Sequence, residues 1–94
     1  MLAVLVANFP GGSAYAMARD IASGHILVTE RTFGRLDPPD LEKLRFELDR
    51  HLREVRGDQP PLDDVTAQRH RNQRIQRLNT ALMILRSYRM KRRT

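Results

Sequence analysis

Residues 37–57, DPPDLEKLRFELDRHLREVRG, carry the clearest helix signal in the chain. Asp37 is a residue type that caps helix N-termini, Pro38 suits the first turn, and Gly57 favours the end of a helix. Between them, apolar residues recur at spacings of three and four, which places them on one helix face. These residues are Leu41, Leu44, Leu48, Leu52 and Val55. The stretch predicts an amphipathic helix over residues 40–56 with a solvated face of mixed charge.

The segment that follows repeats the same initiation signals. Two prolines at 60–61 precede Asp63 and Asp64, so we expect a second helix from about residue 62 to residue 91. Its apolar seam follows the 3-4-3 spacing of a short coiled coil. The seam consists of Ile75, Leu78, Leu82 and Leu85. Because the connection between the two helices is short, the sequence predicts an antiparallel helical hairpin.

The two predicted helices differ in length. At 1.5 Å per residue, the first spans about 25 Å and the second about 45 Å, so we expect the second helix to overhang. The segment ALMIL, residues 81–85, is apolar all round, and we expect it in the overhang, where a partner must cover it. The sequence therefore predicts a homo-oligomer. The expected self-association residues are Leu78, Leu82, Met83, Ile84, Leu85 and Tyr88.

The N-terminal third favours a small mixed unit. Residues 2–7 form a continuous apolar run, which is typical of a buried strand. Ser13 can cap a helix that Gly24 ends, and residues 25–33 resemble a second strand, although 29–33 could instead begin a short helix. We expect an α+β, mainly helical fold in a single domain. A β-α-β unit over residues 1–36 would pack on a helical hairpin over residues 37–94.

The composition excludes several classes of protein. The chain has 94 residues and no Cys, which rules out disulfide scaffolds, thiol catalysis and cysteine-based zinc sites. No apolar run approaches the roughly 20 residues of a membrane-spanning helix, and the run at 2–7 has no preceding basic residue, as a secretory signal requires. We therefore expect a cytoplasmic protein that does not contact a membrane.

Charge is distributed unevenly along the chain. Residues 1–64 contain eight basic and eleven acidic side chains, a net charge of −3, whereas residues 65–94 contain nine basic and no acidic ones. The basic set comprises Arg69, Arg71, Arg74, Arg77, Arg86, Arg89, Lys91, Arg92 and Arg93. A helix that repels itself this strongly is stabilised when an anion neutralises it. The guanidinium group of arginine also binds phosphate through two hydrogen bonds.

These nine residues are the candidate nucleic-acid-binding site, for DNA or RNA, because phosphate contacts release counterions and favour binding of any sequence. Two alternatives stay open. The basic helix could dock on an acidic protein, which would make the chain an assembly or adaptor protein, or it could be an unused solvated face.

Catalytic and metal-binding patterns are absent from the sequence. His25, His51 and His70 are isolated from one another, and the serines have no evident base. The segment FPGGS, residues 9–13, could hold an anion at a helix N-terminus but lacks the Gly-Lys-Ser/Thr of a phosphate-binding loop. Segments 18–22 and 29–33 are separated by too long a gap for a typical helix-turn-helix. We expect a non-enzymatic protein without a cofactor or a metal.

Overall fold

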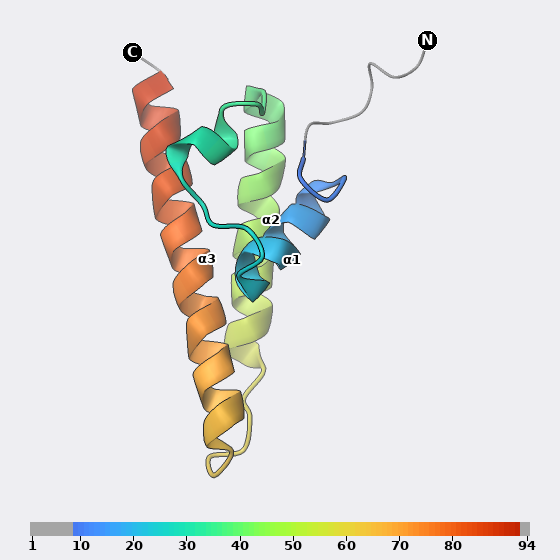
Figure 1. Cartoon of the computed structure of the whole chain (residues 1–94), viewed down its shortest axis with the longest axis vertical. Coiled ribbons are helices and arrows are strands. Elements are labelled where there is room, and N and C mark those ends of the chain that lie inside the picture. The colour runs from blue at the N-terminus through green and yellow to red at the C-terminus, as the bar shows by residue number, and fades with distance from the viewer. Residues whose placement is uncertain (1–8, 93–94) are drawn as a thin grey trace.

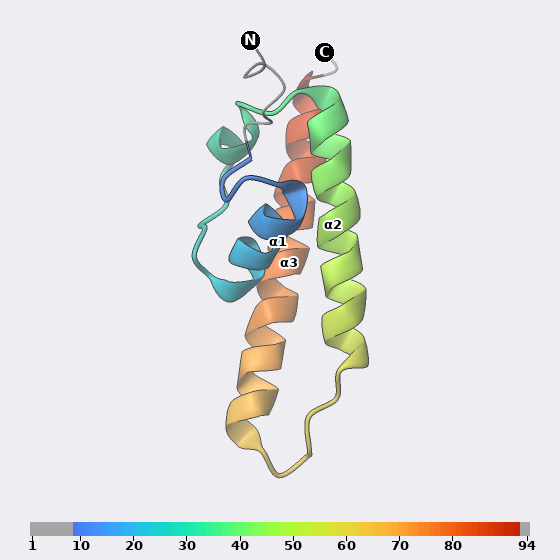
Figure 2. The ribbon, with the colours of Figure 1, turned by 90° about the vertical axis from the view of Figure 1, so that its right-hand side faces the viewer.

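The computed structural model describes residues 9–92, which form three α-helices and one 3-10 helix (Figure 1). In chain order they are α1 (Ala14–Ser23), η2 (Glu30–Phe33), α2 (Pro38–Gly57) and α3 (Val65–Arg92). Helices α2 and α3 run antiparallel as a long hairpin, while α1 and η2 lie together on one face of it (Figure 2). No helix of the described part is long and apolar enough to cross a membrane.

The α2–α3 hairpin confirms the helices predicted from the leucine spacing. The core that joins its two helices consists of Leu41, Leu44, Leu48, Leu52, Leu78, Ala81 and Leu85, all of them buried. Helix α3 begins at Val65, three residues later than expected, because the N–H of Asp64 donates to the carbonyl of Pro61 and closes a turn (3.0 Å). The Asp64 carboxylate then accepts from the N–H of Ala67 (3.0 Å), so it caps the helix.

Helix α1 also forms where the sequence predicts it. The Ser13 hydroxyl accepts from the N–H of Ala16 (3.0 Å). Gly24 ends the helix in the left-handed conformation, with φ +86°, and its N–H turns back toward the carbonyls of Asp20 and Ile21. The side that faces the hairpin is built mostly from small residues, which permit close packing. The buried residues are Ala16, Met17, Ala18, Ile21 and Ala22.

The predicted β-α-β unit is wrong. Residues 25–29 have no regular structure and Glu30–Phe33 form η2, so the described part of the chain contains no strand. The N–H of Thr29 donates to the Thr32 hydroxyl (2.9 Å) and the N–H of Thr32 to the carbonyl of Thr29 (3.0 Å). This local bonding favours a tight turn that buries Phe33 against the hairpin. The strand expected over residues 2–7 lies outside the described residues.

The predicted position of the overhang is also wrong. Arg89 pairs with Glu42 at one end of the hairpin, and Arg71 bonds the carbonyls of Val55 and Arg56 at the other. Residues 78–88 therefore lie alongside α2, and the part of α3 that extends beyond α2 is its N-terminal end, before Arg71. There the side chain of Gln68 donates to the carbonyls of the connecting loop at Pro60 and Pro61.

This register changes the surroundings of the expected self-association residues. Leu78 and Leu85 are buried inside the chain, and Leu82 and Ile84 are partly buried. The ring of Tyr88 packs beside Phe33 of η2, with centroids 5.9 Å apart. Only Met83 of the expected set is largely exposed, at 70%. The rest of the chain therefore covers most of the segment at residues 81–85, and this segment does not require a second copy to cover it.

Candidate nucleic-acid interface

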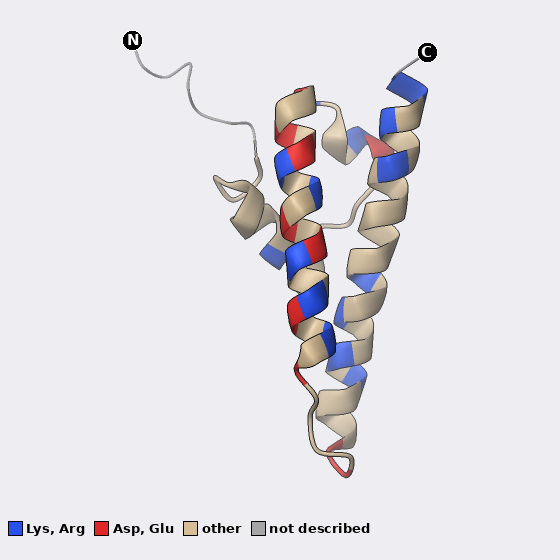
Figure 3. Cartoon of the chain, turned by 180° about the vertical axis from the view of Figure 1, so that it is seen from behind, with Lys and Arg blue, Asp and Glu red and all other residues tan. Residues whose placement is uncertain are grey.

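The cations of α3 fall into two blocks (Figure 3). The first lies near the α2–α3 loop and the second at the C-terminal end of the helix, with the uncharged residues 78–85 between them. The loop-end block is Arg69, Arg71, Arg74 and Arg77, and the terminal block is Arg86, Arg89, Lys91 and Arg92. Arg93, which the sequence analysis placed in the same site, lies outside the described residues.

The terminal block is mostly engaged within the chain. Arg89 pairs with Glu42 of α2 (2.9 Å) and Lys91 with Glu30 of η2 (2.8 Å). Arg92 donates to the carbonyl of Leu36 (3.3 Å). Arg86 forms no hydrogen bond or ion pair with any other residue that the structure describes. Only one cation of this block is thus free to contact a ligand without breaking an internal contact.

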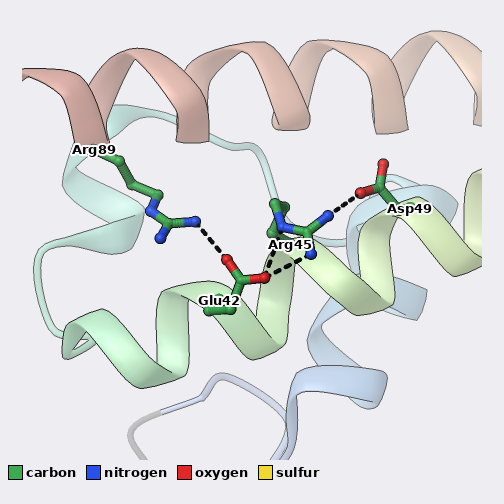
Figure 4. A network of polar contacts seen from close by, with 4 residues as sticks. All are labelled: Glu42, Arg45, Asp49 and Arg89. Carbon is green, nitrogen blue, oxygen red and sulfur yellow. Dashed lines mark hydrogen bonds and ion pairs between the residues drawn. The ribbon is translucent and has the colours of Figure 1, made fainter.

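Glu42 is the centre of the ion-pair network at this end (Figure 4). Arg45 lies between Glu42 and Asp49 on α2 and pairs with both, while Arg89 reaches Glu42 from α3. The hydrogen bonds from Arg45 and then Arg89 lower the pKa of Glu42 from 4.5 to about 2. The hydrogen bond to Glu42 in turn raises the pKa of Arg45. The network keeps Glu42 ionised and partly neutralises the terminal block.

The loop-end block makes a different kind of contact. Arg71 donates to the carbonyls of Val55 (3.2 Å) and Arg56 (2.9 Å) at the C-terminus of α2. Arg77 donates to the carbonyl of Ala22 (3.2 Å) at the C-terminus of α1. A cation at a helix C-terminus satisfies free carbonyls and complements the helix dipole. Because a carbonyl carries no net charge, Arg71 and Arg77 stabilise the fold and still keep their positive charge.

Two further cations of α3 and two of α2 complete the site. Arg69 and Arg74 are exposed and make no hydrogen bond or ion pair within residues 9–92. Arg53 and Arg56, on the last turns of α2, are exposed in the same way. We call these six residues the loop-end cluster: Arg53, Arg56, Arg69, Arg71, Arg74 and Arg77.

The loop-end cluster forms no ion pair with any residue that the structure describes. Glu54, Asp58 and Asp63 lie nearby in the sequence, but within the described part of the chain no carboxylate comes within ion-pair distance of a cluster arginine. The carboxylate of Asp64 is used as the N-cap of α3. The cluster arginines therefore form no ion pair within residues 9–92, while the exposed carboxylates near the loop lower the net positive charge at this end of the hairpin.

Helical periodicity spreads the cluster over more than one face of the hairpin. Arg71 points to the end of α2 and Arg77 to the end of α1, whereas Arg69 and Arg74 lie elsewhere on α3. The prediction that all nine basic residues act alike thus needs correction. The structure describes eight of them, all but Arg93. Of these eight, two pair with carboxylates, three bond backbone carbonyls, and three have no partner among residues 9–92. Sequence reasoning missed Arg53 and Arg56, which the antiparallel hairpin could have located beside the start of α3.

The structure shows one polar pair that the sequence analysis missed. The Ser23 hydroxyl lies 2.7 Å from Nδ1 of His25, the distance of a nucleophile–base hydrogen bond. No other described group bonds the His25 ring to orient it, and the hydroxyl also donates to the carbonyl of Asp20 (3.2 Å). No group of three metal-ligating side chains occurs among residues 9–92. Among residues 9–92 the geometry therefore gives no catalytic set that extends beyond this pair.

Comparisons with known proteins add no relative. Protein-family models, curated proteins and solved structures all give no match to this chain. The site must therefore be interpreted from its own chemistry.

Proposed function

We propose that this protein binds nucleic acid without catalysing a reaction, and that the loop-end cluster contacts the phosphate backbone. One observation supports this proposal above the others: six arginines of α2 and α3 have no carboxylate partner among the described residues. The whole chain carries a net charge of +6.

A polyanion relieves the repulsion within the cluster. Arginine presents a planar fork that matches phosphate oxygens and stays charged at all physiological pH values. Arg71 and Arg77 are committed to helix ends, so four cluster arginines are available for phosphate contacts. These four are Arg53, Arg56, Arg69 and Arg74.

The number of available arginines sets the expected salt dependence. Each phosphate neutralised on duplex DNA contributes about −0.9 to the slope of log K against log salt, so four contacts predict a slope of about −3.6. Binding should then weaken about 100-fold between 50 and 200 mM salt. We expect little preference for sequence, because phosphate contacts carry no base information.

The test compares two variants of equal charge. Replacing Arg69 and Arg74 with Gln (Arg69→Gln/Arg74→Gln) should weaken binding to duplex DNA, single strands and structured RNA alike, and should reduce the slope to about −1.8. The control, Arg31→Gln/Lys43→Gln, removes the same charge from exposed positions outside the cluster and should leave most of the slope. Fluorescence anisotropy at several salt concentrations measures both.

Two results would overturn the proposal. Equal losses in the two variants would show that only net charge matters and that the cluster is not a site. Absence of binding to any of the three nucleic acids at low salt would favour the alternative function, in which the basic helix docks on an acidic protein.

A further inference from the structure

One face of the α2–α3 hairpin has no covering layer in the described structure. Helix α1, η2 and their connecting segments all lie on the opposite face (Figures 2 and 3). The molecule measures 52 × 33 × 19 Å, so it is thin in one direction. Contacts mark the covered side: the ring of His51 on α2 lies 5.4 Å from that of Tyr15 on α1, and Tyr88 on α3 packs beside Phe33. We call the other side the open face.

The open face contains a groove of about 660 Å³ between α2 and α3. Its apolar lining comes from α3: Leu82 is partly buried, Leu85 forms part of the core, and Met90 is 62% exposed. Its polar rim is formed by Arg45, Asp49, Arg86 and Arg89. An apolar floor with a polar rim is the composition of a protein–protein interface.

The charges around this groove have both signs. Asp49 pairs with Arg45 through one carboxylate oxygen, Oδ2, while Arg86 has no partner among the described residues. A two-fold axis through the groove brings the same surface of two copies together. The carboxylate of one copy can then face the unpaired guanidinium of the other. Two of the three rim arginines, Arg45 and Arg89, pair with carboxylates of α2, so Arg86 is the one rim cation without a partner among the described residues, and in this the groove differs from the loop-end cluster.

The size of the open face also suits a dimer. Helix α2 has 20 residues, so the paired part of the hairpin is about 30 Å long, and two helices side by side are about 20 Å wide. The projected area of about 600 Å² approaches the about 800 Å² per partner of a standard stable interface.

We propose that a second copy of this chain covers the open face. Two α2–α3 hairpins pack face to face in a two-fold dimer with a four-helix centre, in which Arg86 of each copy faces Asp49 of the other. Leu82 and Met90 become buried at this contact. The dimer needs no nucleic acid, and its central pair, Arg86 and Asp49, lies outside the loop-end cluster, although the face also includes the last turns of α2, which carry Arg53 and Arg56.

Light scattering and sedimentation equilibrium on the full chain, without nucleic acid, test the dimer. The expected mass is twice the chain mass of 10.9 kDa. Arg86→Glu and Met90→Glu, both at exposed positions, should each weaken self-association at least about tenfold. Their controls on the opposite face, Arg31→Glu and Leu27→Glu, should leave it unchanged. Circular dichroism checks that all four variants keep their helices.

A charge exchange makes the test more specific. Asp49→Arg should weaken the dimer like Arg86→Glu, and combining the two substitutions should restore part of the association. A monomer mass at every concentration up to about 1 mM, open-ended assembly, or equal effects of the open-face and control variants would each overturn the proposal.

Discussion

Gly24 connects the end of α1 to α3 in a way that a single methyl group should disturb. Its φ of +86° lies in the left-handed region, where an L side chain costs about 1 kcal/mol. A Cβ built on Gly24 would lie 2.9 Å from Cζ of Arg77 and 3.1 Å from Nη2 of that guanidinium. The guanidinium would have to move away from the carbonyl of Ala22, to which it donates.

The two effects add in the substitution Gly24→Ala. Loss of the hydrogen bond from Arg77 to the carbonyl of Ala22 costs about 1 kcal/mol at this partly buried position. Together with the backbone cost, Gly24→Ala should lower the free energy of unfolding by about 2 kcal/mol. In an Arg77→Met background the guanidinium is absent, and only the backbone cost of about 1 kcal/mol stays. Urea denaturation followed by circular dichroism measures the free energy of unfolding in the four proteins of this double-mutant cycle.

Gly12 supplies the matched control. Its φ of +97° imposes the same kind of backbone cost, but a Cβ there would meet nothing within 4 Å. Gly12→Ala should therefore cost about 1 kcal/mol whether or not Arg77 is present. If Gly24→Ala were equally destabilising in both Arg77 backgrounds, the inferred capping of α1 by Arg77 would be refuted.

Two further predictions concern the core and the ion-pair network. Leu78 is fully buried, so Leu78→Ala should cost about 2–5 kcal/mol in urea denaturation, whereas Leu27→Ala, at a position 88% exposed, should stay within about 0.5 kcal/mol; similar costs would contradict the packing of α3. The pKa of Glu42 is lowered from 4.5 to about 2, so the stability that its ionised form contributes is present above pH 4.5 and is lost as the pH falls toward 2. Across this pH range, the free energy of unfolding should fall less steeply with acid in Glu42→Gln than in the unaltered protein. An equal fall in both proteins would show that the network does not stabilise the fold.

The hairpin could be predicted because it depends on local signals. The leucine spacing from Leu41 to Leu52 predicts α2, although the Asp37 side chain makes no capping hydrogen bond at its start, and the Asp64 carboxylate caps the start of α3. Their register could not be predicted, because it is fixed by side chains that meet only after folding, such as Arg89 with Glu42. The sequence therefore predicts the overhang at the wrong end of α3.

The predicted second strand failed for a related reason. Residues 25–33 carry residue types common in strands, but a strand needs a neighbour to bond its backbone. The Thr29–Thr32 contacts satisfy part of that backbone locally, and the burial of Phe33 favours the 3-10 turn. Packing in the tertiary structure commonly overrides the strand propensity of short segments.

The candidate site could be predicted only in part. The concentration of arginine in α3 is visible in the sequence, but the carbonyls that Arg71, Arg77 and Arg92 bond are not, since every residue type has a carbonyl. On α2, Asp49 pairs with Arg45, and Arg53 has no ion-pair partner among residues 9–92. The structure thus separates the arginines that hold the fold from those that are free.

Salt dependence of nucleic-acid binding by the unaltered protein is the most direct test of the loop-end cluster. We expect binding to duplex DNA with a slope of log K against log salt of about −3.6, because four arginines at the loop end have no partner among the described residues. A slope near zero would contradict it, as would no detectable binding at low salt.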